Sequence, residues 1–161
     1  MSNILVTGGC GFIGHHFAEH IFKNTNWNII IIDKLTYASS GYERIRDTKL
    51  YNSPRVRLFC YDLTNSISYG LKKEIGEVNY IVHMAAETHV DNSIKDPQLF
   101  ITNNINSTVN ILEFEKKLKN LKIFFYFSTD EVFGPALNDK LFKEWDRHKP
   151  TNPYSASKSA A

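Results

Sequence analysis

The chain has 161 residues, of which 42% are hydrophobic and 22% are charged, as in an ordinary globular protein with a buried core. This composition excludes a collagen-like or intrinsically disordered chain. Nineteen basic residues against 17 acidic ones leave a net charge of +2, which gives no electrostatic reason to expect a nucleic-acid or membrane partner.

Short apolar runs alternate with segments of helical periodicity, which predicts a succession of strands and helices. In chain order we expect a strand at residues 4–6, a helix at 12–23, strands at 28–32 and 56–60, a helix at 66–75, a strand at 80–82, a helix at 97–118 and a strand at 123–127. Pro97 fits the first turn of the longest helix. No apolar run approaches the roughly 20 residues that a membrane-spanning helix needs.

The predicted strands are nearly continuous apolar runs, which are typical of a parallel sheet that helices cover on both faces. Because right-handed crossovers connect such strands, we expect a doubly wound α/β fold of the Rossmann type over residues 1–161. Residues 34–55 and 134–153 are polar and rich in turn formers, and they follow predicted strands. We expect loops or short helices there, at the edge of the sheet where such folds bind ligands.

The chain contains two cysteines, Cys10 and Cys60, which are too few for a disulfide framework. Cys10 lies in a glycine-rich turn and Cys60 ends an apolar run, so we expect reduced, structural thiols and a cytoplasmic protein. The histidines at positions 15, 16, 20 and 148 lack the spacing of metal ligands. We therefore predict that no metal is bound.

Three glycines lie directly between the first predicted strand and the first predicted helix. Gly8 permits a tight turn, Gly11 lets the backbone approach a pyrophosphate, and Gly14 lets the helix pack close to the strand. The predicted helix begins at Phe12, and its first residues, Phe12 and Ile13, then present free N–H groups to the phosphates. This arrangement predicts a dinucleotide site.

Acidic residues end the second and third predicted strands. Asp33 follows Gly14 by 19 residues, close to the spacing of about 20 at which a carboxylate binds the adenosine ribose. A carboxylate there favours NAD over NADP because it repels a 2′-phosphate, and the neighbouring Lys34 weakens that preference. We expect Asp62 and Leu63 beside the adenine, although a helix N-cap explains Asp62 equally well.

The segment Thr7–Gly14 resembles the opening of the extended short-chain dehydrogenase/reductase superfamily. The match continues through DKLTYA, HMAAETHVDNS, STDEVFG and NPYSASK, and it extends from Asn3 to about Ser159. Together these motifs resemble those of the nucleotide-sugar 4,6-dehydratases. Phe133 stands where that family more often has tyrosine, and Ser107 stands where it usually has glycine.

The resemblance implies a reaction on a nucleoside-diphosphate glucose, with NAD as the cofactor. Oxidation at C4 makes the C5 proton acidic, water then leaves from C6, and the stored hydride returns to C6. By position in the family, Thr129 would hydrogen-bond near the 4-hydroxyl, Asp130 would be the acid at the 6-hydroxyl and Glu131 the base at C5. Adjacent carboxylates cannot face the same way on a strand, so we expect both beyond the strand end.

Tyr154 and Lys158 are four residues apart and would share one face of a helix. An ammonium group there would lower the pKa of the tyrosine, as a general base at the 4-hydroxyl requires. In an unrelated protein, however, the same spacing would be an ordinary helix pair.

The segment after the fourth predicted strand completes the implied pocket. Ala85 and Ala86 let the backbone come close to the cofactor, while Glu87, Thr88 and His89 would line the cofactor and sugar pocket. We expect His83 to be a packed strand residue. Asn104 either orients Lys158 through water or is a plain helix-surface residue.

Several expectations concern the whole protein. The chain ends three residues after Lys158, and the family continues into a smaller substrate domain, so we expect these 161 residues to be inactive alone. The resemblance also implies a homodimer formed through the long helix and the Tyr154 helix. It leaves dTDP-glucose and UDP-glucose open as substrates. A UDP-sugar epimerase or decarboxylase and a non-catalytic dinucleotide-binding module are the alternatives.

Overall fold

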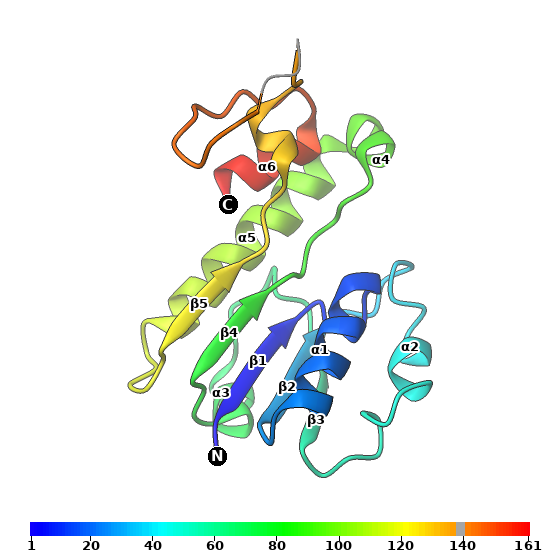
Figure 1. The fold of residues 1–161 in the computed structure, drawn as a ribbon, viewed down its shortest axis with the longest axis vertical. Coiled ribbons are helices and arrows are strands. Elements are labelled where there is room, and N and C mark those ends of the chain that lie inside the picture. Colours follow the sequence, from blue (N-terminus) through cyan, green and yellow to red (C-terminus); the bar gives the residue numbers. More distant parts are fainter. Residues whose placement is uncertain (138–140) are drawn as a thin grey trace.

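A five-stranded parallel sheet forms the centre of the computed structural model, which describes residues 1–137 and 141–161. Its strands are β1 (Asn3–Thr7), β2 (Asn28–Asp33), β3 (Val56–Cys60), β4 (Tyr80–His83) and β5 (Ile123–Tyr126). They lie in the order β3-β2-β1-β4-β5 (Figure 1). The chain thus runs outward from β1 to one edge of the sheet and then crosses to the other side. This order confirms the predicted doubly wound fold.

Helices connect the strands, and some of them lie beyond the carboxyl edge of the sheet. They are α1 (Phe12–Asn24), α2 (Glu43–Arg46), α3 (Tyr69–Ile75), α4 (Val90–Lys95), α5 (Pro97–Glu115), the 3-10 helix η1 (Asp130–Phe133) and α6 (Pro153–Ala160). Beyond the edge, α6 packs against α5 (Figure 1). Among the described residues, no helix combines the length and the apolar character needed to cross a membrane.

The predicted helices are present, with changes at their ends. Helix α3, which was predicted from residue 66, starts at Tyr69, because the Ser68 side chain accepts the Leu71 N–H and caps the helix. Helix α4 has no counterpart among the predicted elements, since six residues are too few to show an apolar stripe. Between residues 34 and 55 the structure contains the short helix α2. Of the predicted loop at 134–153, residues 138–140 lie outside the described part.

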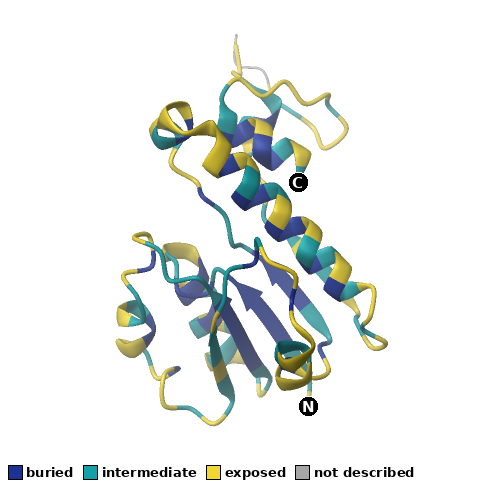
Figure 2. Ribbon diagram, turned by 180° about the vertical axis from the view of Figure 1, so that it is seen from behind, coloured by how far each residue is buried: buried dark blue, intermediate teal, exposed yellow. Residues whose placement is uncertain are grey.

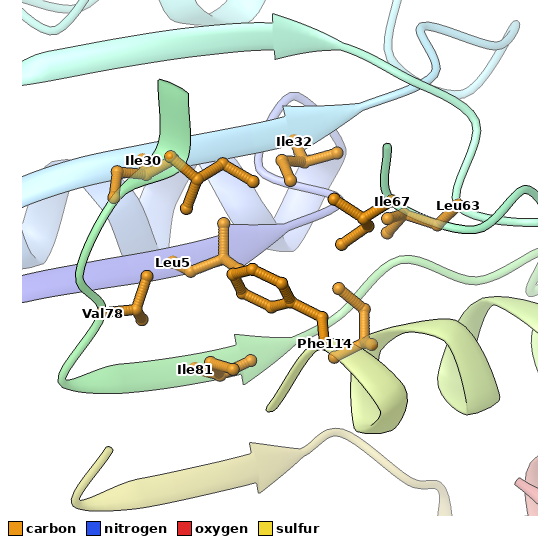
Figure 3. Packing of buried hydrophobic residues seen from close by; sticks show 10 residues of the cluster. Leu5, Ile30, Ile32, Leu63, Ile67, Val78, Ile81 and Phe114 are labelled. Atoms are coloured by element: carbon orange, nitrogen blue, oxygen red, sulfur yellow. The ribbon is translucent and has the colours of Figure 1, made fainter. Parts of the chain in front are cut away.

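Most residues of the central strands are buried (Figure 2), and they form two hydrophobic clusters. On one face, Leu5 and Ile30 pack with Ile81 and Phe114 against α3 and α5 (Figure 3). On the other face, a second cluster contains Val6, Ile29, Ile31, Ala18 and Val82, and it packs against α1 and α2. Each fully buried aliphatic side chain contributes about 1.5–3 kcal/mol, which explains the apolar runs in the middle of the central strands β1, β2 and β4.

Candidate active site

A cavity of about 340 Å³ opens at the carboxyl edge of the sheet. The residues predicted to bind the cofactor all line it: Gly8, Gly11, Phe12, Ile13, Gly14, Asp33, Lys34, Asp62, Leu63, Ala85, Ala86, Tyr154 and Lys158. Of the residues predicted to bind substrate, Glu87 and Thr88 line the cavity, whereas Thr129 and the exposed His89 do not. His89 instead precedes the first residue of α4.

The glycine turn leaves no space for side chains between β1 and α1. Gly8 has a φ of +69°, and a β-carbon there would lie 2.8 Å from the backbone of Ala85. A β-carbon on Gly14 would lie 2.1 Å from the Gly8 carbonyl oxygen. Gly11 precedes the helix without a side-chain cap, so the first N–H groups of α1 face the cavity edge. The turn therefore has the form of an anion cradle.

The Asp33 carboxylate accepts hydrogen bonds from two backbone segments, the glycine turn and the loop after β2. One oxygen accepts the Cys10 N–H at 3.0 Å, and the other accepts the Leu35 N–H at 2.8 Å. These hydrogen bonds join the end of β2 to the glycine turn and hold the carboxylate in place. Burial, aided by the charge of Asp33, raises the pKa of the Cys10 thiol to about 12, so this cysteine is an inert core residue.

Hydrogen-bonded polar side chains connect the loop after β2 to the loop after β4 along the cavity wall. Lys34 donates to Asn103 at 2.8 Å, and Asn103 donates to one oxygen of Glu87 at 3.2 Å. Tyr37 donates to the other oxygen of Glu87 at 3.3 Å. Asn104 accepts the Glu87 N–H and donates to the Glu87 carbonyl oxygen. The buried Asn104 thus holds the backbone beside the cavity, and it is not a helix-surface residue.

The predicted catalytic segment leaves β5 and turns at once. Thr129 caps η1 by accepting the Glu131 N–H at 3.3 Å, and Asp130 and Glu131 stand in the helix that follows. Both carboxylates therefore lie beyond the strand end, as the sequence indicated. They do not line the cavity, but their negative charges raise the pKa of Tyr154, while the nearby Thr129 hydroxyl lowers it.

Tyr154 and Lys158 are buried together on α6 and face the cavity. Burial is the largest effect on both groups. It lowers the pKa of Lys158 to about 8, and together with the charges of Glu131 and Asp130 it raises the pKa of Tyr154 above its ordinary value. The expected lowering of the Tyr154 pKa is therefore wrong for this structure. Lys158 instead donates to the Phe127 carbonyl oxygen and lies 4.3 Å from the centroid of the Tyr126 ring.

His83 is the packed strand residue that the sequence predicted. Its ring is fully buried between the hydroxyl groups of Thr7, at 2.6 Å, and Thr108, at 3.1 Å. Burial, together with the charge of Lys158, lowers the pKa of His83 to about 3, so the ring is neutral at physiological pH. In the described part of the chain, no group of three or more histidine, cysteine or acidic side chains is arranged to hold a metal ion.

The cavity is also lined by residues that the sequence did not predict to belong to the site. They are Ile32, Thr36, Ala38, Ser39, Tyr61, Met84, Asn103, Ser107, Phe127 and Ser128. All but three follow the carboxyl end of a strand, which is a signal that the sequence does contain. Ile32 lies within β2, and Asn103 and Ser107 reach the cavity from α5, so only the packed structure places these three there.

Comparison with known proteins gives consistent matches over nearly the whole chain. The family model described as GDP-mannose 4,6 dehydratase matches residues 5–161. The dTDP-glucose 4,6-dehydratase of Salmonella typhimurium is 37% identical over 177 residues, which cover 98% of this chain and 48% of that protein. The chain therefore spans about half the length of the curated relatives it matches.

Solved structures of two kinds of enzyme have the same fold. DesIV, a dTDP-glucose 4,6-dehydratase from Streptomyces venezuelae solved with NAD bound, has a TM-score of 0.87 at 32% identity, covering 98% of this chain and 48% of its own. The UDP-Glc/GlcNAc 4-epimerase from Campylobacter jejuni has a TM-score of 0.84 at 29% identity, covering 99% and 46%. The fold alone therefore does not separate dehydration from epimerisation.

Proposed function

From the premise that this chain belongs to the GDP-mannose 4,6 dehydratase family, among the nucleotide-sugar 4,6-dehydratases of the extended short-chain dehydrogenase/reductases, we propose that it is the catalytic, NAD-binding part of a lyase. The substrate is a nucleoside-diphosphate glucose, and the product is its 4-keto-6-deoxy derivative. The curated relatives favour dTDP-glucose, with UDP-glucose as the competing substrate.

One observation carries this proposal above all others. Helix η1, which carries Asp130 and Glu131, packs against α6, which carries Tyr154, and Tyr154 lines the cavity of the glycine turn. Oxidation at C4 needs only the tyrosine and a dinucleotide, whereas elimination also needs an acid and a base at the neighbouring carbons. This site offers both sets of groups.

The residues of the cavity fit NAD. The glycine turn, in which no β-carbon fits at Gly8 or Gly14, leaves backbone N–H groups for a pyrophosphate, and Asp33 is held at the position of a ribose-binding carboxylate. Asp62 and Leu63 line the same cavity at the end of β3, where the adenine would lie. When bound, NAD would supply the reversible hydride acceptor that oxidation at C4 and reduction at C6 require.

The side chains then divide the proton transfers among them. Tyr154 takes the proton of the 4-hydroxyl, Thr129 orients the phenol, and Lys158 lines the cavity from the same helix. Glu131 removes the proton from C5 and returns it there when C6 receives the hydride. The exposed Asp130 protonates the 6-hydroxyl, which leaves as water. Since Glu131 is half-buried and Asp130 is exposed, the two carboxyl groups have the different environments that a base and an acid require.

The direct test uses the complete protein that contains this chain. We propose that turnover requires a second, substrate-binding part beyond residue 161, because the relatives are about twice as long. The protein is incubated with dTDP-glucose and, separately, with UDP-glucose, and the 4-keto-6-deoxy product is measured by NMR. Formation of that product from neither substrate would refute the proposed function.

The alternative activity is epimerisation, which the Campylobacter jejuni neighbour favours. The variants Asp130→Asn and Glu131→Gln separate the two activities. A dehydratase loses elimination while it still oxidises C4, whereas an epimerase keeps its activity because neither carboxylate takes part. Inversion at C4 without loss of water would establish the alternative. Turnover of any kind by the complete protein would exclude a non-catalytic dinucleotide-binding module.

We further propose that the complete protein is a homodimer that pairs through α5 and α6. The supporting observation is that α5 exposes several apolar side chains: Leu99, Ile101 and Val109 are 44%, 43% and 50% exposed. Sedimentation velocity of the complete protein tests this, and a monomer at micromolar concentration would contradict it.

A further inference from the structure

The side chain of Asn152 joins the two halves of the catalytic constellation. Its amide nitrogen donates to an oxygen of Glu131 at 2.8 Å. Its carbonyl oxygen accepts the Ser155 N–H at 2.7 Å and so caps α6, the helix that bears Tyr154 and Lys158. A single amide group therefore contacts the proposed C5 base and starts the helix of the proposed C4 base.

The backbone around Asn152 keeps η1 and the start of α6 close together. The Lys149 N–H donates to the Val132 carbonyl oxygen at 2.8 Å. Gly134 has a φ of +80°, and a β-carbon there would lie 2.5 Å from the Lys149 carbonyl oxygen. Because these two contacts lie just after Glu131 and just before Asn152, they hold the Asn152 amide beside the Glu131 carboxylate.

The hydrogen bond from Asn152 also suits the task of Glu131. The amide N–H makes a charge-assisted hydrogen bond to the carboxylate, which holds the group in one orientation. It occupies one oxygen, and the other accepts no hydrogen bond from any residue that the structure describes. The free oxygen is thus available to the substrate, while the bound oxygen fixes the plane of the carboxylate.

We propose that Asn152 is a positioning residue that orients the Glu131 carboxylate relative to Tyr154, so that elimination follows oxidation in the same site. This proposal rests on the proposed dehydratase function and extends it to a residue that does not touch the reacting atoms. It predicts that loss of the amide donor impairs the C5 proton transfer selectively and leaves oxidation at C4 nearly intact.

The chain offers a matched set of variants. Asn152→Ser keeps a good N-cap oxygen but is too short to donate to Glu131, and Asn152→Asp keeps the cap but replaces the donor with a second carboxylate. Ser155→Ala is the control. It removes the other half of the capping box, in which the Ser155 hydroxyl oxygen accepts the Asn152 N–H at 3.3 Å, without contacting Glu131.

The decisive measurement is single-turnover kinetics of the complete protein, which follows reduced cofactor and 4-keto-6-deoxy product separately. In Asn152→Ser and Asn152→Asp we expect product formation to slow by about 10- to 100-fold while reduced cofactor forms at the wild-type rate and accumulates. Ser155→Ala should behave as wild type in both steps. Equal slowing of both steps, or a product rate for Asn152→Ser equal to that of Ser155→Ala, would overturn the proposal.

A second readout does not depend on activity. In the 161-residue chain, the side-chain amide protons of Asn152 should shift in the NMR spectrum when Glu131 is replaced by Gln, because their partner loses its charge. If these resonances do not move, the contact is absent and the positioning role is refuted. If they move but wild type forms no 4-keto product, the proposed function fails and takes the catalytic role of Asn152 with it, although the contact itself stands.

Discussion

The variant Gly14→Ala tests the claim that α1 must pack directly on the glycine turn. The added β-carbon would lie 2.1 Å from the Gly8 carbonyl oxygen and 2.7 Å from the Gly9 α-carbon. Both are backbone atoms, so they cannot rotate away as the end of a side chain could. Helix α1 must therefore move away from β1 by about 1 Å before ordinary van der Waals contact is restored.

Overpacking of this kind costs about 1–3 kcal/mol, and we expect Gly14→Ala near the upper end because the whole helix has to move. For a chain of this size, about 3 kcal/mol corresponds to a fall of roughly 6–12 °C in the melting temperature. The same shift moves the free N–H groups of α1 away from the pyrophosphate position, so NAD affinity should fall as well.

Gly70→Ala is the matched control, since Gly70 also lies in the first turn of a helix. Its added β-carbon would meet no atom closer than the Ser68 hydroxyl oxygen, at 4.0 Å. Without a clash, the loss of chain entropy in the unfolded state should raise the stability by about 0.4–1 kcal/mol. Thermal unfolding followed by circular dichroism, and calorimetric titration with NAD, compare the two variants. If Gly14→Ala unfolds at or above the temperature of Gly70→Ala, the packing argument is wrong.

Three further predictions follow from the site. Asp33→Asn should weaken NAD binding by about tenfold, because a charge-assisted contact to the ribose is lost, and it should reduce the preference for NAD over NADP. Calorimetric titration with both dinucleotides measures the two affinities, and unchanged affinities would contradict the prediction. Burial lowers the pKa of His83 from 6.5 to about 3, so between these pH values the unfolded chain binds a proton that the folded chain excludes. The free energy of unfolding should therefore fall on acidification through this window, by up to about 1.4 kcal/mol per pH unit, and urea titrations should find a shallower dependence in His83→Asn. A thiol reagent should label the exposed Cys60 rapidly and the buried Cys10 only on unfolding, and mass spectrometry that finds equal rates would refute the burial of Cys10.

Local pattern determined most of the architecture. The five apolar runs became the five strands because the central strands of a parallel sheet are buried on both faces and so need consecutive apolar side chains. The glycines at 8, 11 and 14 and the acid at 33 could be placed because their spacing reflects the turn geometry itself. Helix α4 was not predicted, because its six residues are too few to show the apolar periodicity that distinguishes a helix from a loop.

The chemistry of the site depended on contacts that no local pattern contains. The spacing of Tyr154 and Lys158 predicted a lowered tyrosine pKa, but the direction of the shift is set by how much water the fold removes from the phenol and by the carboxylates that η1 brings beside it. The bonds of Asn104 to Glu87, and of Asn152 to Glu131, join residues 17 and 21 positions apart. The sequence by itself thus determined the elements and the cofactor turn, because these follow from short-range sterics and burial. Only the tertiary structure decided which polar groups meet and what charge they carry, because desolvation and long-range hydrogen bonds exist only once the chain has folded.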